Sequence, residues 1–147
     1  MTKILILQGP NLNLTGLREP EIYGRASLGQ IHQEIEDLGV QLGFQTSFLQ
    51  SNHEGVLIDT IQEAMGKYDW IILNPGALSH YSYALRDAVA AAGIPAIEVH
   101  LSNIFAREEF RACSVLAPVC AGQIAGFGYR SYLLALYAIF EGLEGKK

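Results

Sequence analysis

Side chains that can act as acids, bases or amide donors gather at the ends of short apolar runs. Asn11, Asn74 and His100 each lie at or just after the end of such a run, and His53 and His80 lie near two run ends. In an open parallel sheet, ligands bind beyond the carboxyl ends of the strands. Asn and Ser are also common turn residues, so any one of these positions alone is more often structural. Together they favour an acid–base site at one sheet edge.

Glu98 and His100 are two positions apart on a predicted strand, so their side chains point to the same face. A carboxylate beside an imidazole is a usual arrangement for an oriented acid or base. The alternative is that Glu98 forms a salt bridge with an arginine while His100 caps a turn. The remaining histidine, His32, falls inside a predicted helix, where we expect a plain surface or packing residue.

The elements that must position these residues follow from the hydrophobic pattern. Runs rich in Ile, Leu, Val and Phe predict strands, and the segments between them have helix length. The predicted strands are residues 3–8, 44–50, 70–73, 96–99 and 122–127, and the predicted helices are residues 27–42, 54–66, 79–92 and 129–143. This alternation predicts an α/β fold with a parallel sheet covered on both faces. We expect one domain over residues 1–147.

Local signals mark the helix ends. The spacing of Ser27 and Gln30 is that of a capping box, and Gly43, Gly66 and Gly93 stand where C-cap glycines would end helices. These signals support the predicted helix boundaries.

Two connections, residues 9–26 and 101–118, are longer than a strand-to-helix loop requires, and long loops in a compact domain are usually functional or disordered. The first carries Arg18 and Tyr23 and suits a mobile lid. The last helix is apolar around much of its circumference. It either contacts another subunit or packs only on its own sheet, and the sequence favours neither.

Composition excludes several function classes. A net charge of −5 and a pI near 5.3 argue against nucleic-acid binding. An anionic small ligand would need local arginines, and Arg18, Arg107 and Arg111 are the candidates. Neither G-x-G-x-x-G nor G-x-x-x-x-G-K-[ST] occurs in the first loop, which argues against dinucleotide and ATP binding. Without a G-x-S-x-G elbow, a serine hydrolase is not expected either.

The positions of the lysines and cysteines argue against imine chemistry and against a metal site. The lysines lie at a predicted strand start, at a turn on the opposite edge and in the tail: Lys3, Lys67, Lys146 and Lys147. No imine-forming lysine is therefore expected. Cys113 and Cys120 lack C-x-x-C spacing and a nearby histidine. We therefore expect no metal site and two buried free thiols, which favour a reducing compartment. No apolar stretch is long enough to span a membrane, so we expect a cytoplasmic protein.

Six ordered loop segments resemble those of the type II 3-dehydroquinate dehydratases over nearly the whole chain. They are residues 9–14 (GPNLNL), 18–24 (REPEIYG), 50–55 (QSNHEG), 74–77 (NPGA), 98–103 (EVHLSN) and 106–111 (AREEFR). The segment around Ala112 and Cys113 is less typical of the family, and we expect this to affect only peripheral packing.

The resemblance implies a flavodoxin-like, doubly wound, five-stranded parallel sheet, no cofactor, and assembly as a dodecamer built of trimers. It implies dehydration of 3-dehydroquinate to 3-dehydroshikimate by anti elimination through an enolate, in the shikimate pathway of aromatic amino acid biosynthesis. By the same resemblance Tyr23 is the base, Arg18 the cation that favours its phenolate, and Asn11 holds a water at the enolate oxygen. His100 protonates the leaving hydroxyl, and Glu98 orients its ring. A free phenol has a pKa of about 10, so a base of this kind needs a nearby cation.

The resemblance also assigns the remaining site residues. Substrate contacts fall on Asn74, His80, Leu101, Ser102 and Arg111. Asp87 is similar to a residue that reaches a neighbouring subunit's site. Arg107 is expected to order the site from behind the contact residues, or to form a plain salt bridge.

Two other classes remain compatible with the fold alone. One is a flavodoxin-like electron carrier or nucleotide-binding module, and the other is a non-catalytic oligomeric scaffold that retains the loops. A bound flavin would colour the purified protein yellow, and a scaffold would not turn over 3-dehydroquinate.

Overall fold

The computed structural model describes residues 1–145 and is built on one parallel sheet; Lys146 and Lys147 lie outside the described residues. The five strands run in the order β2-β1-β3-β4-β5, which is the flavodoxin-like order. Their bounds are β1 Thr2–Gln8, β2 Phe44–Gln50, β3 Trp70–Asn74, β4 Ala96–His100 and β5 Gly122–Ala125. The predicted α/β fold and doubly wound sheet are confirmed.

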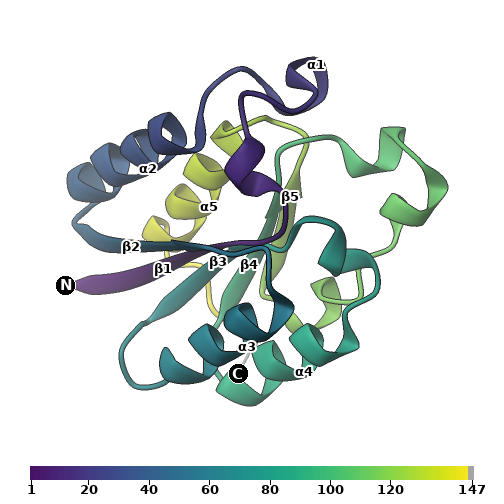
Figure 1. Cartoon of the computed structure of the whole chain (residues 1–147). Coiled ribbons are helices and arrows are strands. Elements are labelled where there is room, and N and C mark those ends of the chain that lie inside the picture. The colour runs from purple at the N-terminus through teal and green to yellow at the C-terminus, as the bar shows by residue number, and fades with distance from the viewer. Residues whose placement is uncertain (146–147) are drawn as a thin grey trace.

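Helices cover both faces of the sheet (Figure 1). The helices are α1 Pro20–Tyr23, α2 Leu28–Leu42, α3 Glu54–Glu63, α4 Tyr83–Ala92 and α5 Arg130–Phe140. Short 3-10 helices span Leu12–Leu14, Gly76–His80, Ile104–Ala106, Glu109–Ala112 and Ala117–Val119. The α2 and α5 helices pack on one face of the sheet, and α3 and α4 pack on the other.

Most predicted boundaries hold within a few residues. The capping box is confirmed, because Gln30 N donates to Ser27 Oγ at 3.2 Å and Ser27 N donates to Gln30 Oε1 at 2.8 Å. The predicted helix 79–92 is too long at its start. The structure instead forms a 3-10 turn that ends at His80, and Ser82 caps α4 by accepting from Leu85 N at 3.0 Å.

Three further ends differ from prediction. The α3 helix ends at Glu63 with Ala64 as its C-cap, so Gly66 lies beyond the cap. The α5 helix begins after Tyr129 and ends at Phe140, short of residue 143. The last strand ends at Ala125 rather than at residue 127. Propensity places element ends less well than element cores, because the last turn depends on capping contacts.

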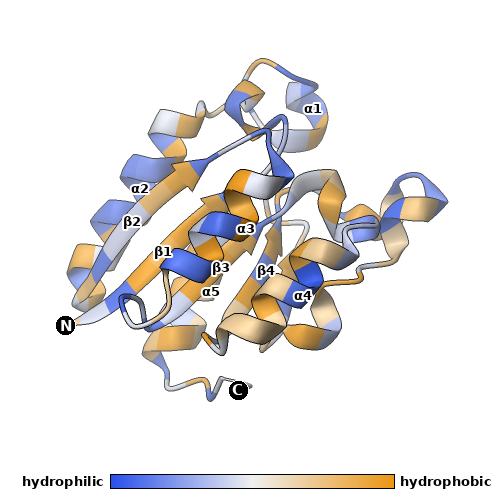
Figure 2. Cartoon of the chain, turned by 60° about the horizontal axis from the view of Figure 1, so that its bottom comes forward, coloured by the Kyte–Doolittle hydropathy of each residue, from blue (hydrophilic) through white to orange (hydrophobic). Residues whose placement is uncertain are grey.

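Two apolar layers hold the sheet between the helices. Ile4 and Ile6 face α2 and α5, whereas Leu5 and Leu7 face α3 and α4, as side-chain alternation in a strand requires. Figure 2 shows the orange, apolar colouring of the central strands and the blue, polar residues on α2 and α3. None of the helices in residues 1–145 is long and apolar enough to cross a membrane.

The sheet register brings the carboxyl ends of β1, β3 and β4 together. Gln8 pairs with Asn74, and Leu73 pairs with Glu98. The loops that follow β1 and β3 are in direct contact, because a Cβ atom on Gly9 would lie 2.5 Å from the carbonyl oxygen of Pro75. Only glycine permits this approach. The candidate residues of three strands are therefore neighbours.

The outer side of α5 stays exposed in the single chain. Leu134, Tyr137 and Phe140 are 42%, 47% and 52% exposed. The inner side packs on the sheet and on α2. The apolar circumference predicted from the sequence is thus only half covered by this chain.

Candidate active site

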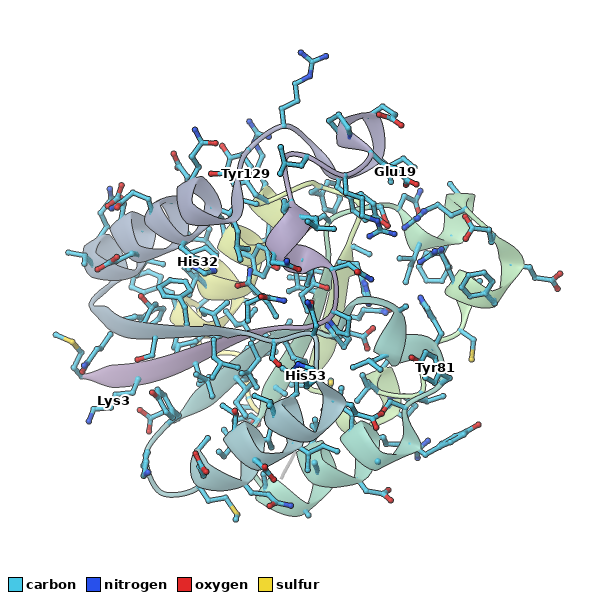
Figure 3. All side chains as sticks on the ribbon, in the orientation of Figure 1. Lys3, Glu19, His32, His53, Tyr81 and Tyr129 are labelled. Carbon is cyan, nitrogen blue, oxygen red and sulfur yellow. The ribbon has the colours of Figure 1, made fainter. Side chains whose placement is uncertain are left out.

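A cavity of about 200 Å³ opens at the carboxyl ends of β1, β3 and β4. Its lining includes all the predicted site residues except Glu98 and Asp87. These lining residues are Asn11, Arg18, Tyr23, Asn74, His80, His100, Leu101, Ser102, Arg107 and Arg111. Figure 3 shows Lys3 at the opposite end of the molecule from Glu19, which marks the loop beside this cavity. Loops far apart in the sequence therefore build one site.

Two guanidinium groups contact the ring of Tyr23. The Cζ atom of Arg18 lies 4.7 Å from the ring centroid, and the Cζ atom of Arg107 lies 5.0 Å from it. Arg18 and Tyr23 come from the same loop, in which α1 ends at Tyr23, whereas Arg107 comes from the loop after β4. Positive charge near a phenol favours its anionic form. The arrangement suits a tyrosine that acts as a base.

Arg107 lies in the wall of the cavity and not only behind it. It lines the cavity beside Tyr23, and its Nη1 donates to Ser102 Oγ at 3.1 Å. Its Nε is buried and has no hydrogen-bond partner within residues 1–145. The ion pairs of the described residues join His100 to Glu98 and Arg111 to Glu108, so the salt bridge considered for Arg107 is not formed.

The predicted pair on β4 is formed. His100 Nε2 lies 2.5 Å from Glu98 Oε2, and both side chains are buried. The carboxylate lies behind the cavity wall, so it contacts the ring and not the cavity. One ring nitrogen of His100 is held by Glu98, which leaves Nδ1 for a reacting group. This geometry is that of an oriented imidazole acid.

Two residues that sequence reasoning missed hold Glu98 in place. Ser114 Oγ donates to Glu98 Oε1 at 2.6 Å, and Gln123 Nε2 donates to Glu98 Oε2 at 3.0 Å. A fully buried charge needs such partners. Gln123 lies on β5, next to Glu98 in the sheet register. Neither residue carries a local sequence signal for this role.

The expectation that the segment near Ala112 and Cys113 matters only for peripheral packing is wrong. The carbonyl oxygen of Cys113 accepts a hydrogen bond from His80 Nδ1 at 2.8 Å, and the next residue is Ser114. The segment therefore orients two site histidines, one directly and one through Glu98.

His80 lies beside His100 with the rings nearly parallel, at 6.2 Å between centroids and 16° between planes. Desolvation by burial lowers the pKa of His80, and the nearby His100 and Arg111 also lower it, against the opposing effect of the Cys113 carbonyl. A neutral ring with its proton on Nδ1 presents Nε2 as a hydrogen-bond acceptor. His80 therefore suits a substrate hydroxyl better than an anionic group.

Asn11 adopts the left-handed backbone conformation, with φ 71°. Asparagine tolerates this region better than most residues. Its backbone N–H donates to Asn52 Oδ1 at 3.0 Å, and Gln50 Nε2 donates to the same oxygen at 3.2 Å. The loop after β2 thus holds the loop after β1, and Asn11 lines the cavity.

Asn74 lies at the end of β3 and lines the cavity, and two hydrogen bonds hold its side chain. Its Nδ2 donates to the hydroxyl of Tyr132 at 2.9 Å, and its Oδ1 accepts from Gly76 N at 3.2 Å. Tyr132 lies on α5, among the residues that the sequence pattern marks only as apolar. Its hydroxyl is the part of the side chain that hydrophobic periodicity cannot predict.

Arg111 and Asp87 differ in their relation to the cavity. Arg111 lines it and pairs with Glu108, at 2.6 Å between Nε and Oε2. The side-chain hydrogen bond to Arg111 lowers the pKa of Glu108. Asp87 is exposed on α4 and does not line the cavity. Its predicted contact with a neighbouring subunit stays a prediction.

Within residues 1–145, no group of three or more His, Cys, Asp or Glu side chains is arranged to hold a metal ion. Lys3 and Lys67 line a separate hollow at the other end of the strands. Lys146 and Lys147 lie outside the described residues. The expected burial holds for Cys120 and is wrong for Cys113, which is exposed because its segment runs over the surface.

The residues that sequence reasoning left as structural include His32. Its ring stacks on Phe48 at 4.3 Å between centroids, so the expected packing role is confirmed. Its Nε2 also lies 2.5 Å from Gln8 Oε1. Desolvation by burial lowers the pKa of His32.

Known proteins of one family match this chain over nearly its full length. The sequence profile of the family "Dehydroquinase class II" matches residues 2–140. The 3-dehydroquinate dehydratase of Caldicellulosiruptor bescii is 56% identical over 145 residues, which cover 98% of this chain and 100% of that protein. The 3-dehydroquinate dehydratase of Bacillus cytotoxicus is 55% identical over 143 residues, or 97% of this chain and 98% of that protein.

A solved structure gives the same answer for the fold. The crystal structure of a type II dehydroquinase from Butyrivibrio crossotus superposes with a TM-score of 0.93 at 46% sequence identity. The superposition covers 96% of this chain and 98% of the Butyrivibrio chain. Sequence, fold and cavity residues agree, and the chain belongs to the class II dehydroquinase family.

Proposed function

We propose that this enzyme dehydrates 3-dehydroquinate to 3-dehydroshikimate by anti elimination through an enolate. One observation carries the proposal. A tyrosine contacted by two guanidinium groups and a histidine held by a buried carboxylate line the same cavity of about 200 Å³. An elimination next to a ketone needs a base, a stabiliser for the enolate oxygen and an acid for the leaving group.

The first step removes a proton. The C2–H bond is acidic because its electrons pass into the neighbouring ketone, so the proton moves to the Tyr23 phenolate and an enolate forms. Arg18 and Arg107 stabilise the phenolate before transfer, at 4.7 and 5.0 Å from the ring centroid. Asn11 holds a water that donates a hydrogen bond to the enolate oxygen.

The second step expels the hydroxyl group on C1. The enolate collapses to a conjugated ketone, the C1–O bond breaks, and the leaving oxygen takes a proton from His100 and departs as water. Glu98 orients the ring through its 2.5 Å contact with Nε2. Tyr23 then loses its proton to solvent, and His100 takes up a proton from solvent. The reaction is redox-neutral, so we propose that it needs no organic cofactor and no metal.

The other cavity residues bind the substrate. Asn74, His80 and Arg111 present amide, imidazole and guanidinium groups to it. The backbone N–H groups of Leu101 and Ser102 suit its carboxylate. Arginine and N–H donors give the cavity local affinity for an anion despite the net charge of −5.

We propose that residues 1–147 form a single catalytic domain, which acts in the cytoplasm as a homo-oligomer, a dodecamer built of trimers. The exposed apolar side of α5 and the exposed Asp87 support subunit contacts. Native mass near that of one 16.1 kDa chain in light scattering would contradict the assembly.

The test of function is the appearance of the conjugated enone, followed by its ultraviolet absorbance after 3-dehydroquinate is added to the purified protein. We expect turnover that a metal chelator leaves unchanged. Absence of turnover would refute the proposal and favour the scaffold alternative, and a yellow protein with a flavin spectrum would favour the electron carrier.

A further inference from the structure

A buried chain of polar side chains runs beneath the floor of the cavity. Tyr132 is 1% exposed, and Gln8 and Asn74 are 0% and 2% exposed. Gln8 Nε2 donates to Tyr132 Oη at 3.0 Å, and Asn74 Nδ2 donates to the same oxygen at 2.9 Å. At the outer end His32 Nε2 contacts Gln8 Oε1. Figure 3 labels His32, which α2 places on the sheet face that α5 also covers.

These hydrogen-bonded side chains link separate elements of the fold. Gln8 ends β1, Asn74 ends β3, Tyr132 lies in the first turn of α5, and His32 lies on α2. Hydrophobic packing of α5 needs only the ring of Tyr132. A phenylalanine would fill the same space, so the hydroxyl has a role beyond packing.

The bonds to Asn74 decide what its amide presents to the cavity. Its Oδ1 is held by Gly76 N–H, and one of its two Nδ2 hydrogens is held by Tyr132. The terminal torsion of asparagine is otherwise broad and nearly two-fold. With both ends held, the amide cannot turn over without leaving a buried donor or acceptor unpaired, which is costly. The second Nδ2 hydrogen stays available to the cavity.

The hydroxyl of Tyr132 also stays neutral. Burial raises the pKa of Tyr132 to about 12, against the opposing effect of the hydrogen bonds from Gln8 and Asn74. The oxygen therefore accepts hydrogen bonds from both amides at any pH at which the enzyme would work, and the orientation of Asn74 does not change with pH.

We propose that Tyr132, held by Gln8, is a positioning residue for the reaction: its hydroxyl fixes the orientation in which the Asn74 amide faces the substrate. The inference rests on the proposed function, in which Asn74 contacts the substrate. Tyr132 and Gln8 do not touch the cavity, so they act only through Asn74.

The test is a double-mutant cycle on kcat/KM with Tyr132→Phe, Asn74→Ala and the double variant. We expect Tyr132→Phe alone to lower kcat/KM about 10- to 100-fold, the range that misplacing a substrate-positioning group produces. In the Asn74→Ala background the same change should have almost no further effect, because the residue through which it acts is gone. Equal losses in both backgrounds would overturn the proposal.

Controls separate positioning from folding. Tyr68→Phe removes a hydroxyl from a side chain beside Lys67, in the separate hollow at the other end of the strands, and it should leave kcat/KM unchanged. If Tyr132→Phe does not fold, Gln8→Met replaces it in the cycle. This variant keeps the side-chain length and removes the bond that holds Tyr132, so we expect a smaller loss that again vanishes with Asn74→Ala.

A readout independent of activity distinguishes this inference from the proposed function. The side-chain amide resonances of Asn74, identified by their absence in Asn74→Ala, should shift in Tyr132→Phe and not in Tyr68→Phe. Unchanged resonances would overturn the positioning role even in an active enzyme. A wild type without turnover would refute the proposed function, while shifted resonances would still show that Tyr132 fixes the Asn74 amide.

Discussion

We expect the hydrogen bond from Ser114 to Glu98 to contribute to both stability and catalysis. Ser114 Oγ donates to a fully buried carboxylate at 2.6 Å, and it accepts from Leu116 N at 3.2 Å and from Ala117 N at 3.0 Å. Ser114→Ala removes all three bonds. It also leaves one oxygen of the buried carboxylate without its donor.

The size of the effect follows from these contacts. A hydrogen bond to a charged group contributes about 1.5–3 kcal/mol, and a neutral one about 1 kcal/mol. Ser114 itself is partly exposed, so water replaces some of what is lost. We therefore expect the free energy of unfolding to fall by about 2–4 kcal/mol. We also expect kcat to fall about tenfold, since Glu98 then orients His100 less well.

The assay is urea unfolding followed by circular dichroism, with steady-state kinetics at a temperature where both proteins are folded. Ser51→Ala is the matched control, because Ser51 Oγ accepts a single bond, from His53 N at 3.0 Å. Ser114→Thr keeps the hydroxyl and should recover most of the loss. If Ser114→Ala matches Ser51→Ala in both stability and kcat, the role assigned to this bond is wrong.

Three further outcomes are expected. Tyr23→Phe should fold and bind substrate while kcat falls by several orders of magnitude, and near-normal kcat would move the base elsewhere, with His100 or His80 as the leading candidate. Arg18→Ala should also lower kcat severely, because it removes one of the two guanidinium groups that contact the ring of Tyr23, and a near-normal kcat would contradict this. Burial lowers the pKa of His32, so the unfolded chain takes up a proton at higher pH than the folded one. Stability should therefore fall as pH drops below about 6.5. The melting temperature of His32→Leu should decline less over that range than that of the wild type, and an equal decline in both proteins would contradict this.

The pattern of the sequence determined the fold class, and its resemblance to a known family assigned most of the cavity residues. Apolar runs alternating with helix-length segments identify the five strands and the helices between them, because side-chain periodicity is a local property. The carboxyl ends of parallel strands meet at one edge of a sheet, so the placement of Asn74 and His100 followed from their positions at the ends of strands predicted to be parallel. The spacing of Glu98 and His100 predicted their pairing, since alternate residues of a strand share a face.

Tertiary structure alone decided what supports those residues. Gln8 and Tyr132 are 124 positions apart, and Ser114 and Gln123 reach Glu98 from two different segments. A serine, a glutamine or a tyrosine has no local pattern that marks it as a partner of a buried amide or carboxylate. Packing excludes water from certain polar groups, and each of these buried groups must then find its hydrogen-bond partner within the fold. The tertiary structure, and not a local pattern, therefore selects the partner. The contact of Arg107 with Tyr23 has the same origin: the two residues meet only when the loop after β4 folds against the loop after β1.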